Sequence, residues 1–96
     1  MDRNTIQQLL AAHRADLDRF HVKSLAVFGS VARGESGPAS DVDMLVEFSN
    51  TPGFDQYMDL KFFLEDLLKR HVDLVTPDAL KPRIRLNVER EAVRVA

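Results

Sequence analysis

A strand-like segment over residues 42–48 constrains the fold of this chain more than any other feature. Its side chains alternate between two faces, and those on one face are all apolar: Val42, Met44, Val46 and Phe48. Such a pattern predicts a sheet strand whose apolar face packs against other elements. The opposite face carries Asp43, and Asp41 precedes it on that face, about 6–7 Å away between Cα atoms. Two acids held this closely repel one another unless a cation lies between them.

The other elements follow from hydrophobic spacing and turn residues. Apolar side chains at helical intervals predict helices over residues 5–19, 54–70 and 79–92, with Asn4 or Thr5 capping the first. Short apolar runs predict further strands over 24–28 and 71–75 and an edge strand over 93–95, with loops at 34–40 and 51–53. The expected order is α-β-β-α-β-α, an α/β (α+β) fold in which helices cover one face of a small mixed sheet.

Length and composition fit one domain over residues 1–96. The chain lacks cysteine, its N-terminus is polar, and no apolar run approaches ~20 residues, so we expect a cytoplasmic protein without a membrane segment. Basic residues gather in the last sixteen positions, but the net charge is −2. This balance is unlike that of a basic DNA-binding module, and nucleic acid is not the expected partner.

The turn after the first strand provides a second element of a site. Gly29 can adopt backbone angles closed to other residues, and the N–H groups of the turn, with the Ser30 hydroxyl, can then face a phosphate. Arg33 follows closely enough to reach a phosphate through its guanidinium. An ion pair with Glu35 or a contact with a loop carbonyl is an alternative role for Arg33.

A third acid, Asp73, lies in the predicted strand over residues 71–75. If that strand pairs beside residues 42–48, Asp73 lies about 4.5–5.5 Å from Asp43. Asp41, Asp43 and Asp73 could then hold two magnesium ions roughly 3.5–4 Å apart, the arrangement used in nucleotidyl transfer.

These residues resemble the minimal nucleotidyltransferase family of the DNA polymerase β-like superfamily. The resemblance rests on Gly29 to Glu35, Ser40 to Val46 and Val72 to Val75, and it covers nearly the whole chain. It implies the nucleotidyltransferase fold, a triphosphate-binding turn at Gly29 and Ser30, and ATP as substrate. It also implies that Asp41 and Asp43 are ligands shared by two Mg²⁺ ions and that Asp73 is the third ligand.

Short members of this family are often antitoxins paired with a toxin of the HEPN ribonuclease class. The resemblance therefore implies transfer of AMP from ATP to a toxin tyrosine within a hetero-oligomer. A small open sheet also needs another chain to enclose ATP and an acceptor. The alternative is a non-catalytic antitoxin, a binding module that neutralises its partner by covering it, using apolar side chains around Phe62, Phe63 and Leu67.

Overall fold

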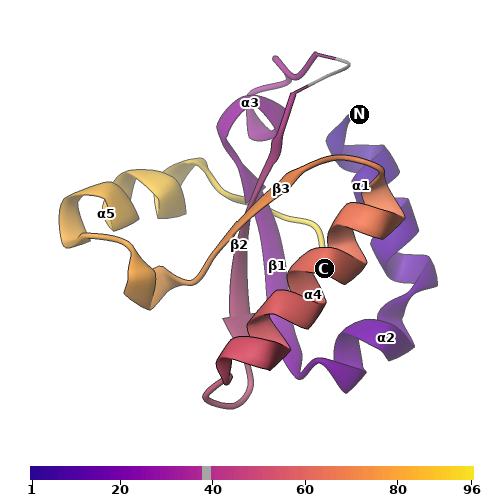
Figure 1. Cartoon of the computed structure of the whole chain (residues 1–96). Coiled ribbons are helices and arrows are strands. Elements are labelled where there is room, and N and C mark those ends of the chain that lie inside the picture. Colours follow the sequence, from indigo (N-terminus) through magenta and orange to yellow (C-terminus); the bar gives the residue numbers. More distant parts are fainter. Residues whose placement is uncertain (38–39) are drawn as a thin grey trace.

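The computed structural model describes residues 1–37 and 40–96 and forms a four-stranded sheet flanked by helices (Figure 1). The helices are α1 (Arg3–Ala12), α2 (Arg14–Arg19), α3 (Gly29–Ala32), α4 (Phe54–Leu68), the 3₁₀ helix η1 (Pro77–Ala79) and α5 (Pro82–Glu91). The strands are β1 (Val22–Phe28), β2 (Val42–Phe48), β3 (Val72–Val75) and β4 (Val93–Arg94). Pro38, in the expected loop over 34–40, lies outside the described residues.

The sheet is mixed, and its strand order is β3-β2-β1-β4. β1 pairs antiparallel with both β2 and β4, whereas β2 and β3 are parallel. The parallel pair is joined by α4, which provides the long crossover that parallel strands require. The predicted fold class is therefore confirmed.

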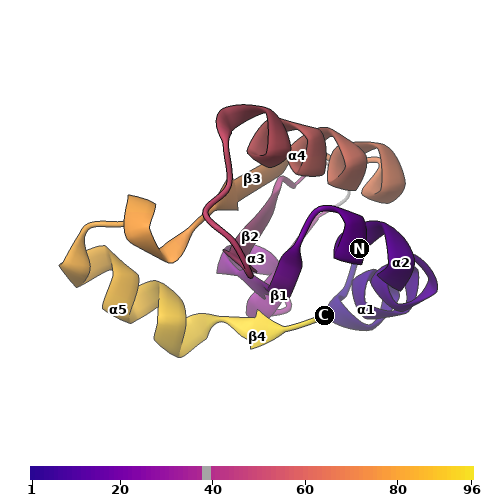
Figure 2. The ribbon, with the colours of Figure 1, turned by 90° about the horizontal axis from the view of Figure 1, so that it is seen from below.

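The core lies between the sheet and the helices α1, α2 and α4. Completely buried side chains from the two sides interdigitate there, among them Leu10, Leu17, Leu25, Met44, Val46, Leu60 and Leu64. Their burial removes enough apolar surface from water to hold the helices on this face. The helix α5 lies across the sheet from these three helices (Figure 2), so the expectation of helices on one face holds for α1, α2 and α4 only.

The first helix differs from its prediction in two ways. Asp2, rather than Asn4 or Thr5, caps it by accepting a 2.8 Å hydrogen bond from the Thr5 backbone N–H. The helix then breaks at His13, whose backbone leaves helical geometry and separates α1 from α2. Leu10 before the break and Leu17 after it are both buried in the same core.

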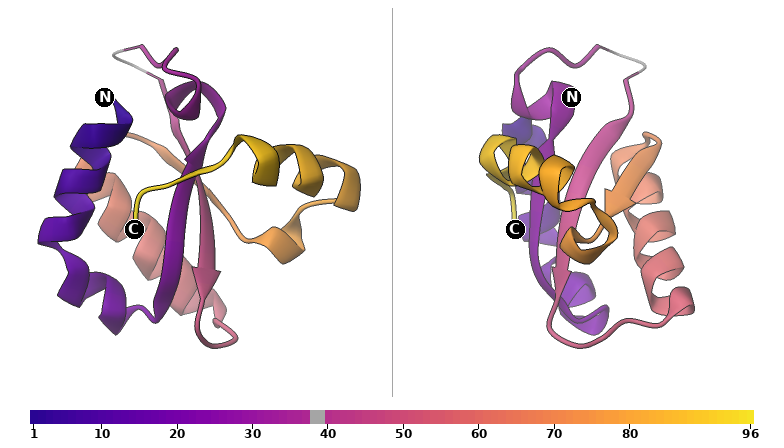
Figure 3. Two further views of the ribbon diagram at one scale, coloured as in Figure 1. Left: turned by 180° about the vertical axis from the view of Figure 1, so that it is seen from behind. Right: turned by 90° about the vertical axis from the view of Figure 1, so that its left-hand side faces the viewer.

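Other boundaries moved by a few residues. α4 ends at Leu68 because Lys69 adopts a left-handed conformation (φ 56°), two residues before the predicted end. The last predicted helix divides into η1 and α5, with Pro82 in the first turn of α5. From behind, β4 can be seen alongside β1 at the edge of the sheet (Figure 3). No helix in the described residues is long and apolar enough to cross a membrane.

Candidate active site

The turn after β1 is shaped by Gly29. Its φ of 68° lies in the left-handed region, which glycine adopts at little cost. The short helix α3 begins at this residue, so Ser30 follows in its first turn. Glu35 donates its backbone N–H to the Ser30 carbonyl oxygen at 2.8 Å, which closes the chain back over the turn.

The carboxylate of Asp43 packs directly against this turn. A Cβ atom built on Gly29 would overlap Asp43 Oδ2 and lie 3.2 Å from Asp43 Cγ. Glycine is thus favoured at position 29 by its backbone angle, and any side chain there would have to displace the Asp43 carboxylate. This contact joins the turn expected to bind phosphate with an acid expected to bind metal.

Asp43 and Asp73 are direct partners in the parallel pairing of β2 and β3. The sequence predicted this adjacency only on the condition that the two strands pair, and they do. Burial raises the pKa of Asp43, and the neighbouring carboxylates of Asp73 and Asp41 raise it further, while Arg33 opposes them. The negative charges of the three carboxylates are therefore not balanced by nearby positive side chains. A bound cation would supply the missing positive charge.

A histidine that the sequence analysis did not single out belongs to the same cluster. His71 Nδ1 lies 3.5 Å from Asp41 Oδ2 and 3.8 Å from Asp73 Oδ1. Ligand atoms of these three exposed residues all lie within 4.8 Å of one another. Asp43 is not part of this group, although its carboxylate interacts with that of Asp73 and lies beside Gly29. The signal for His71 was its position two residues before Asp73, which puts both side chains on one face of an extended chain.

The donor set fits a divalent cation. Asp41, Asp43 and Asp73 offer the carboxylate oxygens that Mg²⁺ prefers, and the imidazole of His71 is better suited to transition metals. Asp43 and Asp73 lie within β2 and β3, and Asp41 directly precedes β2. Such a cluster can hold a cation that offsets its repulsion.

Arg33 is held by two carboxylates. Its guanidinium lies 3.0 Å from Glu35 and 2.6 Å from Glu91, the last residue of α5. The pair with Glu35 is the alternative that the sequence left open, and the pair with Glu91 connects residues far apart in the chain. Arg33 lies near enough to Asp43 to lower its pKa, so a phosphate at the turn would compete with Glu35 and Glu91 for this guanidinium.

The family model of the nucleotidyltransferase domain matches residues 10–95. The chain belongs to the nucleotidyltransferase domain family. This match includes the Gly29-Ser30 turn and all three acids, so it covers the site as well as the fold.

Individual relatives agree with this assignment. The nucleotidyltransferase is 44% identical over 91 residues to the protein adenylyltransferase MntA of Thermococcus cleftensis, with 94% of this chain and 92% of the relative covered. It is 39% identical over 94 residues to a proposed protein adenylyltransferase of Methanocaldococcus jannaschii, with 94% of each chain covered.

Solved structures share the fold. A proposed minimal nucleotidyltransferase superposes with a TM-score of 0.82 at 40% identity, covering 97% of this chain and 95% of the other. A toxin–antitoxin structure with AMP-PNP superposes with a TM-score of 0.73 at 23% identity, covering 100% of this chain and 73% of the other. At that identity the second likeness concerns the fold alone.

Proposed function

We propose that this nucleotidyltransferase transfers AMP from ATP to the hydroxyl group of a tyrosine on a partner toxin of the HEPN class, and that it acts as the antitoxin. One observation carries the chemical part of this proposal. The parallel register sets Asp73 beside Asp43, and Asp43 in turn packs on the Gly29 turn. The acids and the turn that we propose binds phosphate thus adjoin one another, as nucleotidyl transfer requires.

The roles of the residues follow from their places in the cluster. Gly29 and Ser30 would hold the triphosphate through the turn. Asp41 and Asp43 would be shared by two Mg²⁺ ions, and Asp73 would be the third ligand; the magnesium would neutralise the phosphates and polarise the attacking hydroxyl. Arg33 would contact the β- or γ-phosphate once freed from its carboxylates.

The reaction balances as a single displacement. The acceptor oxygen forms a bond to the α-phosphorus of ATP while the bond from that phosphorus to the bridging oxygen breaks. The hydroxyl proton leaves toward the carboxylate of Asp73, and pyrophosphate departs on the side of Ser30. The electrostatic contribution of the site is to stabilise charge that develops on the phosphate oxygens.

The names of the relatives support a protein as the acceptor. MntA of Thermococcus cleftensis is a protein adenylyltransferase, and this chain covers 92% of it. The exposure of Asp41, His71 and Asp73 is also favourable, because a bulky partner can then approach the cluster. A HEPN toxin remains the partner implied by the sequence resemblance.

Labelled ATP tests this reaction class. With the proposed HEPN toxin and magnesium present, label at the α-phosphate should appear on the toxin, whereas label at the γ-phosphate should appear in pyrophosphate. Asp73→Asn should abolish the labelling, and Asp66→Asn, at a carboxylate with 89% side-chain exposure on α4 and outside the cluster, should not. Transfer of the γ-label to the toxin would indicate phosphoryl transfer and contradict the proposal.

A non-catalytic antitoxin is the competing function, and two side chains favour it. Phe62 is 56% exposed and Phe54 is 77% exposed, both on α4, and large exposed apolar groups are common in protein interfaces. The two functions predict different dependences on ATP. A non-catalytic antitoxin neutralises the toxin without ATP, whereas an adenylyltransferase needs ATP to do so. A toxin ribonuclease assay with and without ATP separates the two.

A further inference from the structure

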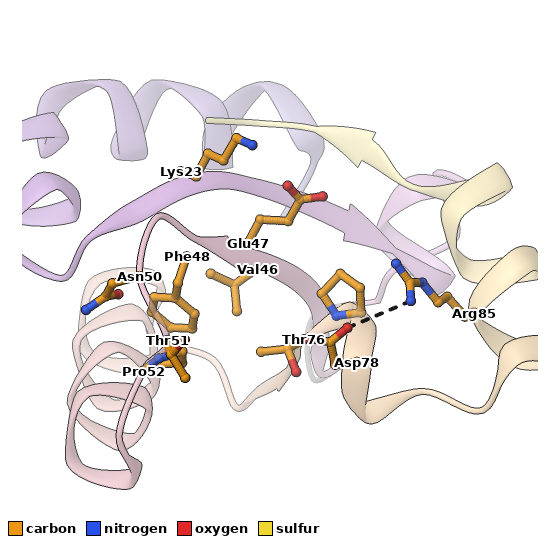
Figure 4. Close-up of a pocket in the computed structure, with 11 residues that line it drawn as sticks. Lys23, Val46, Glu47, Phe48, Asn50, Thr51, Pro52, Thr76, Asp78 and Arg85 are labelled. Carbon is orange, nitrogen blue, oxygen red and sulfur yellow. Dashed lines mark ion pairs between the residues drawn. The ribbon is translucent and has the colours of Figure 1, made fainter.

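A pocket opens where the pairing of β3 with β2 ends. The two strands pair only as far as Leu45 and Val75, and the chain then turns away through η1. The pocket has a volume of about 400 Å³. It is lined by residues from β1, the end of β2, the following loop, η1 and α5, and Figure 4 shows these side chains around it. Gly29, Asp41, Asp43 and Asp73 do not line it.

The lining combines apolar surfaces with polar groups. Phe48 and Pro77 offer flat apolar surfaces, and Thr76 adds a hydroxyl. Figure 4 shows Phe48 and Thr76 on one side of β2, whereas Glu47 points to the other side. At the α5 side, Arg85 Nη1 lies 3.8 Å from Asp78 Oδ1 (Figure 4), so donors and an acceptor meet there. Proteins bind nucleobases through the same kinds of group: rings and guanidinium groups stack on the base, and polar groups form hydrogen bonds with its edges.

The distance from the acidic cluster to this pocket can be followed along β2. Asp43 and Glu47 lie on the same face of the strand, because they are four residues apart, which corresponds to about 13 Å. Glu47 lines the pocket, and Asp43 lies at the turn. An extended nucleoside phosphate has a reach of this order from its phosphorus to the far edge of its base.

α5 provides a second, independent estimate of the distance between the expected phosphate site and the pocket. Glu91 at its end pairs with Arg33 beside the turn, whereas Arg85 lines the pocket. Glu89 chiefly, and Asp78 and Glu47 to a smaller extent, raise the pKa of the Arg85 guanidinium. Six residues of helix separate Arg85 from Glu91, or about 9 Å. One helix thus has residues at the expected phosphate site and at the pocket.

We propose that this pocket binds the nucleobase of the nucleotide whose triphosphate is held at Gly29 and Ser30. This inference rests on the proposed function, since it assumes that the turn binds a triphosphate. The sequence showed no base-binding residues because the lining comes from four separate stretches of the chain. Its residues have no shared motif and meet only where β3 ends.

Binding measurements with two ligands test the proposal without requiring a partner or turnover. The probes are a non-hydrolysable ATP analogue and inorganic tripolyphosphate, each with magnesium, titrated into the full chain. Arg85→Ala removes the guanidinium from the pocket, and Thr76→Met replaces the hydroxyl with a larger apolar group. Arg83→Ala is the matched control, because Arg83 is an exposed arginine on the same helix but does not line the pocket.

The two ligands should respond differently. We expect Arg85→Ala and Thr76→Met to raise the Kd of the ATP analogue about tenfold and to leave that of tripolyphosphate within about twofold. Arg83→Ala should change neither by more than about twofold, and thermal melting should show all three variants folded. Equal losses for both ligands, or an unchanged affinity for the ATP analogue, would overturn the nucleobase site. Failure of the unmodified chain to bind either ligand would overturn the proposed function as well.

Discussion

The carboxylate of Asp43 occupies the space into which a side chain at Gly29 would project. Gly29 also has a φ of 68°, whereas Gly34, with a φ of 71°, has open space around its Cα. The two glycines therefore have similar backbone conformations but different surroundings. Only Gly29 has an acid of the candidate site, Asp43, in the space that a side chain would occupy.

Substitution at these glycines separates backbone strain from the contact with Asp43. Gly34→Ala should cost about 1 kcal/mol of unfolding free energy, from the positive φ alone. Gly29→Ala should cost about 2–3 kcal/mol and abolish nucleotide binding, because the new methyl group displaces the carboxylate. Denaturant unfolding measures both values.

A double variant provides the internal control. Asp43→Ala should recover part of the stability lost in Gly29→Ala, because it removes the atoms that the methyl group would overlap. Additive effects of the two substitutions would show that the contact has no energetic consequence.

The raised pKa of Asp43 gives a prediction about pH. A carboxyl group whose pKa is higher in the folded than in the unfolded chain stabilises the fold below its unfolded pKa. This contribution is lost as the pH rises through the folded pKa. At neutral pH the ionised Asp43 therefore destabilises the metal-free protein, and Asp43→Asn should raise its Tm while abolishing AMP transfer. The rise in Tm should disappear when melting is measured at a pH below the ordinary aspartate pKa, and Asp78→Asn should show no such change.

Glu65 should affect stability in the opposite sense. The N–H of Val72, 3.0 Å from Glu65 Oε2, and Lys61, 3.1 Å away, lower the pKa of Glu65. Its contribution is therefore present above the unfolded pKa and lost as the pH falls through the folded pKa. Glu65→Gln should lower the Tm at pH 7 and have a progressively smaller effect in acid. Asp66→Asn, at a side chain with 89% exposure on the same helix, should leave the Tm unchanged across this range.

The ion pair between Arg33 and Glu91 predicts a change in nucleotide affinity. Glu91→Gln frees the guanidinium from one competing carboxylate, so the KM for ATP should fall up to about fivefold, the equivalent of an exposed ion pair. Arg33→Ala should raise the KM. Steady-state kinetics measures both, with Asp18→Asn as the control because it breaks an exposed pair with Arg14 on α2. A higher KM in Glu91→Gln would mean that Glu91 positions Arg33 for the phosphate rather than withholding it.

Alternation and apolar runs were sufficient to predict the strands and the positions of Asp43 and Asp73. These features depend on local periodicity, and one sheet pairing then brought the acids together. The break at His13 was missed because Leu10 and Leu17 fit a continuous helical stripe. Only the packing of α1 against α4 and of α2 against β1 distinguishes two helices from one. The role of Glu91 and the pocket beside Arg85 were inaccessible to sequence reasoning, since each depends on where α5 lies across the sheet.

The mass of the partner toxin tests the central claim most directly. After incubation of this chain with the toxin, ATP and magnesium, intact-mass spectrometry should show the toxin heavier by one or more AMP units. The increase should be absent with Asp73→Asn or without ATP, and the toxin's ribonuclease activity should fall only where the mass has increased. A toxin of unchanged mass that is nevertheless neutralised would contradict AMP transfer and favour inhibition by contact.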